Sequence, residues 1–247
     1  MFTFAERLPM KQQIPNAITL LNLFCGCCAL VNVFYGHFIS VFWFLFVAGL
    51  ADYLDGAVAR WLGVHSSLGK ELDSLADLVS FGVVPGAILY MLLTENPVPE
   101  VVPQLNWMAA PAFLVSIFSG LRLAKFNLDT RQSENFIGLS TPPACLFVTG
   151  LMLIYYYNSF GIGQQIATPW VLYPVILVLS YLLVAEIPMF SFKFKQLTWS
   201  GNEIRITFAL LSIVLLIVLR EAAFSLIILL YILVNLFLLG KNSKIQS

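Results

Sequence analysis

The sequence predicts an all-α protein that crosses a membrane several times. Of its 247 residues, 60% are hydrophobic and only 11% are charged, and the mean hydropathy is +0.88. The apolar residues fall into repeated runs near the ~20 residues that a helix needs to cross a bilayer. The net charge is zero and no basic block occurs, so we expect no nucleic-acid partner and favour a small or lipidic ligand.

The apolar runs predict eight spanning helices in order along the chain. We place them at residues 18–36, 40–62, 72–94, 107–126, 141–158, 169–189, 206–220 and 222–240. The last two are separated only by the charged pair Arg220-Glu221, which interrupts about 35 mostly apolar residues, too many for one crossing. We therefore predict a tight helical hairpin at that point.

Lysines and arginines mark every second connection between these spans. They precede the first span and follow the second, fourth, sixth and eighth: Arg7 and Lys11; Arg60 and Lys70; Arg122, Lys125 and Arg131; Lys193, Lys195 and Arg205; Lys241 and Lys244. The alternate connections "TENPVPEVVPQLN" and "NSFGIGQQIATP" contain none, and only Arg220 falls on their side. Because loops rich in Lys and Arg stay on the cytoplasmic side, we expect both termini to face the cytoplasm. We expect the protein to lie in the cell membrane.

The stretch "DYLDGAVARWLGVHSSLGKELDSLAD", from Asp52 to Asp77, places four aspartates at this same side. One carboxylate at the bilayer centre costs ~2.5–3.5 kcal/mol, so water or a cation must offset the four. Asp52 lies nine residues before Trp61, a plausible interfacial anchor, which puts it roughly 13 Å inside the membrane. We therefore expect the carboxylates to line a cavity open to the cytoplasm.

The spacing arranges the carboxylates as two facing pairs. Four residues share about a third of the circumference of the second span: Asp52, Asp55, Gly56 and Ala59. Asp73 and Asp77 share a face of the next, antiparallel helix. Oxygen-only ligands favour Mg²⁺ or Mn²⁺ with retained waters, or Ca²⁺, and such ions often share their coordination with a substrate phosphate.

The pattern Asp52-x₂-Asp55-Gly56-x₂-Ala59-Arg60-x₈-Gly69-x₃-Asp73-x₃-Asp77 resembles the signature of the CDP-alcohol phosphatidyltransferase family. The resemblance implies a six-helix membrane core, commonly homodimeric, that transfers a phosphatidyl-type group from a CDP-linked lipid to an alcohol and releases CMP. The core would cover residues 18–189. An interfacial cytoplasmic segment, 1–17, would precede it, and a hairpin with a short cytoplasmic tail, 190–247, would follow.

The resemblance also implies roles for individual residues. Asp52, Asp55 and Asp73 would hold a metal ion, and Asp77 would complete a second Mg²⁺ or Mn²⁺ site and act as general base on the attacking hydroxyl. Four further residues would serve the nucleotide and its diphosphate: Gly56, Ala59, Arg60 and Gly69. Asn16 and Thr19, in "PNAITLLN", are similar to a stretch that contributes to the nucleotide site; they would equally suit helix capping and polar contacts at the membrane interface.

Four more stretches resemble the branch of this family that forms phosphatidylserine from CDP-diacylglycerol and L-serine: "ELDSLADLVSFGVVPG", "GLRLAKFN", "FIGLSTPPA" and "EIPMFSFK". Arg122 suits the carboxylate of serine, and Asn127 suits either the carboxylate or the ammonium group of serine. Lys125 and Arg131 are interpreted as positive charges that fix the topology, and Arg122 could also have only that role. The spacing does not decide between direct attack and a covalent intermediate; we favour direct attack, because all four aspartates already have other roles. The acceptor could instead be glycerol 3-phosphate or an inositol phosphate, and intramembrane carboxylates would also suit a cation transporter.

Overall fold

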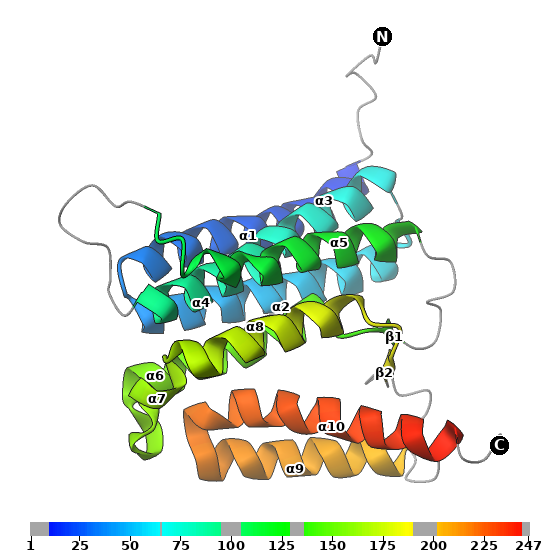
Figure 1. Ribbon diagram of the computed structural model, residues 1–247. Helices are drawn as coiled ribbons and strands as arrows, with labels where there is room; N and C mark the ends of the chain where they lie inside the picture. Colours follow the sequence, from blue (N-terminus) through cyan, green and yellow to red (C-terminus); the bar gives the residue numbers. More distant parts are fainter. Residues whose placement is uncertain (1–9, 65, 95–104, 129–135, 190–201, 244–247) are drawn as a thin grey trace.

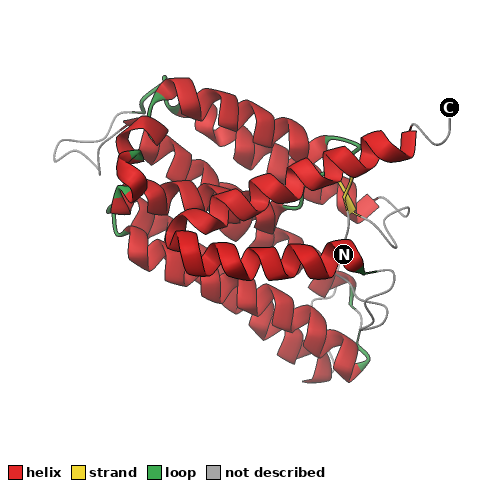
Figure 2. Ribbon diagram, turned by 90° about the horizontal axis from the view of Figure 1, so that it is seen from below, coloured by secondary structure: helices red, strands yellow, loops and turns green. Residues whose placement is uncertain are grey.

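The computed structural model describes residues 10–64, 66–94, 105–128, 136–189 and 202–243, which form a bundle of roughly antiparallel helices (Figure 1). Figure 2 shows the bundle from below, with nearly every described segment in helix. Among these residues, strand is confined to one antiparallel pair, β1 (Phe136–Ile137) and β2 (Pro188–Met189). The all-α class predicted from the sequence is confirmed.

Helices α1 (Met10–Phe34) and α2 (Phe38–Leu62) form the first hairpin and make the most extensive pairing among the described elements. α1 begins inside the segment expected to be interfacial. α2 ends at Gly63, whose φ of 64° is left-handed and therefore favours glycine. The chain thus reverses about two helical turns after Asp55.

The third span is one continuous rod made of three segments. α3 (Ser67–Asp77) begins at Ser66, whose hydroxyl accepts a hydrogen bond from the Gly69 N–H at 2.9 Å. A π-helical segment, η1 (Leu78–Val83), follows directly after Asp77, and α4 (Val84–Thr94) completes the rod. The wider turn precedes Pro85, which has no N–H to donate to the preceding turn. The Ser116 hydroxyl donates to the Gly82 carbonyl within this segment at 2.8 Å.

The core is centred on α4, where nearly every side chain is buried, including Ile88, Leu89 and Leu92. Helix α1 packs against it, together with α5 (Leu114–Leu128), α6 (Thr141–Tyr157) and α8 (Pro169–Val184). Short turns join them, namely η2 (Ala110–Phe113), η3 (Ser159–Gly161) and α7 (Gly163–Ile166). The β1–β2 pair closes the opposite end of α6 and α8, where the Gly138 N–H donates to the Ile187 carbonyl at 2.9 Å.

The C-terminal hairpin consists of α9 (Glu203–Leu219), the turn η4 (Arg220–Ala222) and α10 (Ala223–Ser243). The two helices lie side by side and antiparallel in Figure 1. Arg220 adopts φ 51° at the turn, so the predicted hairpin at Arg220-Glu221 is confirmed. α10 packs on α6, where the Ser225 hydroxyl donates to the Phe147 carbonyl at 2.7 Å.

The chain is a membrane protein with several apolar helices. By length and composition, four stretches of the described chain could cross a bilayer: Lys11–Phe34, Phe38–Leu62, Ser67–Thr94 and Glu203–Phe237. The last of these is the stretch that the hairpin folds in two. α8 is apolar but shorter, with 16 residues. Each of the eight predicted spans nevertheless overlaps helical structure in the described chain. The fourth was placed too early, because α5 begins only at Leu114, and the sixth too long, because α8 ends at Val184 before β2.

Most of the described basic residues gather at one end of the bundle. The starts of α1, α3 and α9 and the ends of α2, α5 and α10 all lie at that end (Figure 1). Lys11, Arg60, Lys70, Arg122, Lys125 and Arg205 belong to these helix ends, whereas Arg220 lies at the opposite end. Arg7, Arg131, Lys193, Lys195 and Lys244, also used for the topology, lie outside the described residues.

Candidate active site

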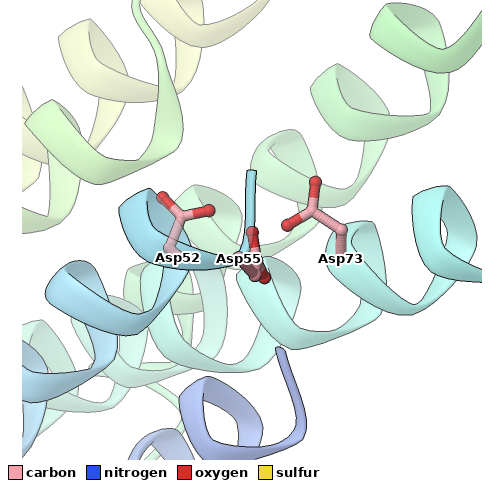
Figure 3. A group of neighbouring side chains, drawn as sticks. All are labelled: Asp52, Asp55 and Asp73. Carbon is pink, nitrogen blue, oxygen red and sulfur yellow. The ribbon is translucent and has the colours of Figure 1, made fainter. Parts of the chain in front are cut away.

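Three carboxylates converge where α2 and α3 approach each other. Asp52, Asp55 and Asp73 each offer one oxygen, and these oxygens lie within 4.8 Å of one another. Figure 3 shows the first two on neighbouring turns of α2 and Asp73 beside them on α3. The predicted juxtaposition of the two helices is therefore confirmed for three of the four aspartates.

Two polar side chains of helix α1 donate hydrogen bonds to the aspartates. The Thr19 hydroxyl donates a 2.6 Å hydrogen bond to Asp55 Oδ2. One turn further along α1, the fully buried Asn22 donates from Nδ2 to Asp77 Oδ1 at 3.2 Å. Asn22 closes the stretch "PNAITLLN", yet sequence reasoning missed it, because an amide inside an apolar helix does not by itself reveal its partner.

Asp77 lies one helical turn beyond Asp73 and is not part of the 4.8 Å group. Its carboxylate is bound by Asn22 and attracted electrostatically by the guanidinium of Arg122. Asp77 therefore stands in a different setting from the other three aspartates, between an amide on α1 and a cation on α5.

The cluster of three carboxylates suits a divalent cation. Asp73 Oδ1 is buried and has no hydrogen-bond partner, and Asp55 is 7% exposed. Negative oxygens brought together with little solvent repel one another, and a shared cation relieves that repulsion. Carboxylates from two helices are the hard ligands that Mg²⁺ and Mn²⁺ prefer.

A cavity of about 520 Å³ opens beside this cluster and gathers most of the predicted nucleotide residues. Its lining includes Asn16, Thr19, Asp55, Gly56, Ala59, Gly69 and Asp73. The glycines leave necessary space: a Cβ on Gly69 would lie 2.9 Å from Ser66 Oγ and 3.1 Å from Asn16 Oδ1. Five of the six predicted nucleotide residues thus line one cavity, and Arg60 does not.

Arg60 is exposed and folds back over Gly56, where a Cβ would lie 3.3 Å from its Nη1. The absence of a side chain at Gly56 therefore makes room for the guanidinium as well as for a ligand.

The cavity also has lining residues to which sequence reasoning assigned no role in the site: Gln12, Pro15, Val64, Ser66, Ser67 and Lys70. From the sequence, Lys70 reads only as a topological charge. Its Nζ donates to the Asn127 carbonyl at 2.9 Å, which ties α3 to α5. Its position between Gly69 and Asp73 of the motif is the signal that could have revealed it.

The two predicted acceptor residues have different settings. Arg122 is 7% exposed, its Nε has no hydrogen-bond partner, and its guanidinium carbon lies 5.7 Å from the Phe126 ring centroid. Asn127 instead uses its amide on Ser74, donating from Nδ2 at 2.8 Å. Arg122 thus presents a buried, incompletely bonded cation beside Asp77, whereas Asn127 connects two helices near the end of the bundle.

Known proteins resemble this chain over the region that contains the aspartate cluster. The model of the CDP-alcohol phosphatidyltransferase family matches residues 12–183. The CDP-diacylglycerol–serine O-phosphatidyltransferase of Bacillus subtilis is 35% identical over 180 residues, which are 73% of this chain and 91% of that protein. Proteins of the same name from Mycobacterium leprae and Helicobacter pylori are 34% and 32% identical, over 75% and 81% of this chain and 60% and 80% of their own lengths.

Proposed function

The chain belongs to the CDP-alcohol phosphatidyltransferase family, and from this membership we propose that it transfers the phosphatidyl group of CDP-diacylglycerol to the hydroxyl of L-serine. The products are phosphatidylserine and CMP, so the protein is a phosphotransferase of phospholipid synthesis. The observation that carries the proposal is the carboxylate cluster at the wall of the nucleotide-sized cavity. The names of the three relatives support serine as the acceptor.

Asp52, Asp55 and Asp73 hold a divalent cation in this proposal, and Asp77 contributes to a second one. The ions are Mg²⁺ or Mn²⁺, which the all-oxygen ligand set favours. Bound there, they would supply positive charge against the diphosphate and the departing CMP. Thr19 fixes the rotamer of Asp55 by its 2.6 Å hydrogen bond, so α1 keeps one ligand oriented.

The cavity holds the cytidine nucleotide. Gly56, Ala59 and Gly69 let the ligand approach the backbone, and Asn16 and Thr19 offer polar contacts. Two cations stand near the diphosphate: Lys70 in the cavity wall and Arg60 above Gly56. These residues position the phosphorus for attack, and positioning is the main contribution a protein makes to phosphoryl transfer.

Asp77 takes the proton from the serine hydroxyl as the new oxygen–phosphorus bond forms and the bond to CMP breaks. Asn22 orients its carboxylate by the hydrogen bond to Oδ1. The buried Arg122 binds the serine carboxylate, for which its unpartnered Nε leaves a donor available. Asn127 stands at the outer edge of the acceptor site, and the attack on phosphorus is direct.

The orientation and assembly complete the proposal. The site and both termini face the cytoplasm from the cell membrane, because most described basic residues belong to helix ends at that side of the bundle. The core, residues 18–189, carries the chemistry and assembles as a homodimer, and the start of α1 adds Asn16 to its nucleotide site. Of the segment 1–17 expected at the interface, the part from Met10 onward thus belongs to α1, and 190–247 add the hairpin and tail.

CMP release by the purified protein in detergent tests this function. CDP-diacylglycerol and Mg²⁺ or Mn²⁺ are combined with L-serine, glycerol 3-phosphate, an inositol phosphate or no acceptor. We expect release that requires serine and is lost in Asp77→Asn. Glu71→Gln removes an exposed carboxylate from the same helix and should retain activity.

The remaining outcomes each have a defined meaning. Release with a phosphorylated acceptor would retain the family chemistry and reject serine. No release with any acceptor would reject the transferase and favour a cation transporter.

A further inference from the structure

The α9–α10 hairpin lies beyond residues 12–183, which the family model matches, and takes no part in the chemistry described above. Together with α2 and α6 it encloses a groove of about 840 Å³. The groove is lined mainly by hydrocarbon side chains, among them Leu45, Leu50, Leu146, Ile213 and Ile228. The hairpin thus adds an apolar surface to the side of the core that carries Asp52 on α2.

Two hydroxyl groups along this lining are already bonded within the protein. Ser212 donates to the Phe208 carbonyl at 2.8 Å, and Thr149 donates to the Cys145 carbonyl at 2.8 Å. These two groups therefore have no hydrogen to donate to a ligand, and the groove between them suits a hydrocarbon occupant.

One end of the groove lies next to the candidate active site. Tyr53, which lines the groove, directly follows Asp52 on α2. Tyr231 of α10 lines it as well and interacts electrostatically with Arg122. A lipid whose diphosphate occupied the aspartate cluster would therefore have its chains at the opening of the groove.

The far end is formed by a pair of aromatic rings. Phe42 of α2 and Phe224 of α10 have ring centroids 5.5 Å apart. Both also line a second cavity of about 320 Å³, which is bordered by Trp43, Tyr157 and Arg220. The two rings therefore separate the long groove from a space beyond it.

The groove is about as long as one extended lipid chain. Tyr53 and Phe42 lie eleven positions apart on α2, which corresponds to roughly 16 Å at the helical rise per residue. The hydrocarbon core of a bilayer is ~30 Å thick, so one lipid chain spans about half of it. The groove thus has the depth of a single chain.

We propose that this groove holds one hydrocarbon chain of the CDP-linked lipid donor, and that the Phe42–Phe224 pair sets the length of chain it accepts. The inference rests on the proposed function, because the diphosphate must occupy the aspartate cluster for the chain to enter. A lipid chain that enters the groove moves from the apolar membrane into an apolar protein surface, so it gains little from the hydrophobic effect. The fit of the chain to the groove therefore decides which chain length is preferred. A chain that extends past the rings must bend or displace them.

Donors of increasing chain length test the proposal: dioctanoyl, dilauroyl and distearoyl CDP-diacylglycerol, compared by kcat/KM with saturating serine. We expect the unmodified protein to prefer dilauroyl over distearoyl donor. Phe224→Ala opens the groove into the second cavity and should reduce this preference about tenfold, the lower end of what one methylene is worth in an apolar pocket. Ser212→Phe fills the groove and should shift the preference toward the dioctanoyl donor.

Phe237→Ala is the matched control, because Phe237 lies on the same helix and is 75% exposed. It should reproduce the chain-length profile of the unmodified protein. An identical profile in Phe224→Ala, Ser212→Phe and the unmodified protein, with serine-dependent CMP release intact, would overturn this proposal alone. Loss of serine-dependent release in the unmodified protein would instead reject the proposed function.

A second measurement does not depend on turnover. A CDP-lipid with a diazirine at the end of one chain is photolysed with the protein, and the labelled peptide is identified by mass spectrometry. We expect labelling of peptides containing Phe42 or Phe224, diminished by Ser212→Phe. Equal labelling by a phosphatidylcholine that carries the same diazirine would show a general lipid site and overturn the assignment to the donor.

Discussion

Removing the amide of Asn22 tests whether Asp77 must be held from α1. In Asn22→Leu, Asp77 Oδ1 loses the Nδ2–H group whose nitrogen lies 3.2 Å away. A hydrogen bond to a charged group is worth ~1.5–3 kcal/mol, and the length of this one places it in the lower half of that range. Converted at ~1.36 kcal/mol for each factor of ten, we expect kcat/KM to fall roughly 13-fold to 45-fold.

Two opposing effects limit the change in folding stability: the Asp77 carboxylate loses a donor, and a buried acceptor without a partner is removed at the same time. Asn22 Oδ1 is buried without a partner, so an apolar side chain of similar size also removes an unsatisfied acceptor. The assay is serine-dependent CMP release, with thermal unfolding measured on the same preparation. We expect the loss mainly in kcat, because substrate contacts are unchanged.

Asn32→Leu is the control. Asn32 also lies on α1, but its amide donates to the Cys28 carbonyl, away from the aspartates. Unchanged kcat/KM in Asn22→Leu, in protein that unfolds at the normal temperature, would refute the role given to this hydrogen bond. An equal loss in both variants would trace the effect to the helix and not to Asp77.

Three further outcomes follow from the same contacts. A chelator should abolish CMP release and Mn²⁺ should restore it, and Asp73→Asn should weaken Mn²⁺ binding, measured by calorimetry, at least tenfold. Gly69→Ala should raise KM for the CDP-lipid several-fold in steady-state kinetics, because its Cβ would lie 2.9 Å from Ser66 Oγ. Gly150→Ala should destabilise the protein by about 1–3 kcal/mol in denaturant unfolding, because its Cβ would collide with the Ser225 backbone.

The aspartate cluster could be predicted because it depends on local geometry. Asp52 and Asp55 share a helix face by spacing alone, and a connection of a few residues forces α3 to return beside α2. The hairpin at Arg220 was equally accessible, since the length of the apolar run exceeded one crossing. Such features need no knowledge of distant contacts.

The remaining features depend on packing between distant segments. Asn22 and Asp77 lie 55 positions apart, and nothing in either neighbourhood indicates the partner of the other. The pairing of β1 with β2 joins two connections that resemble family stretches, yet sequence alone did not show that Phe136 would pair with Met189. The groove also could not be predicted from the sequence, because it forms only where the α9–α10 hairpin packs against α2 and α6.

The π-helical segment η1 sets the rotation of α3 relative to α4 within the continuous third span. An α-helix turns about 100° per residue, so deleting one residue between Leu78 and Val83 would rotate Asp73 and Asp77 by that amount relative to α4. The buried α4 cannot rotate in compensation, because Ile88 and Leu89 are enclosed on all sides. A shortened rod would therefore keep its core and turn its carboxylates away from α2, giving a folded protein without a metal site.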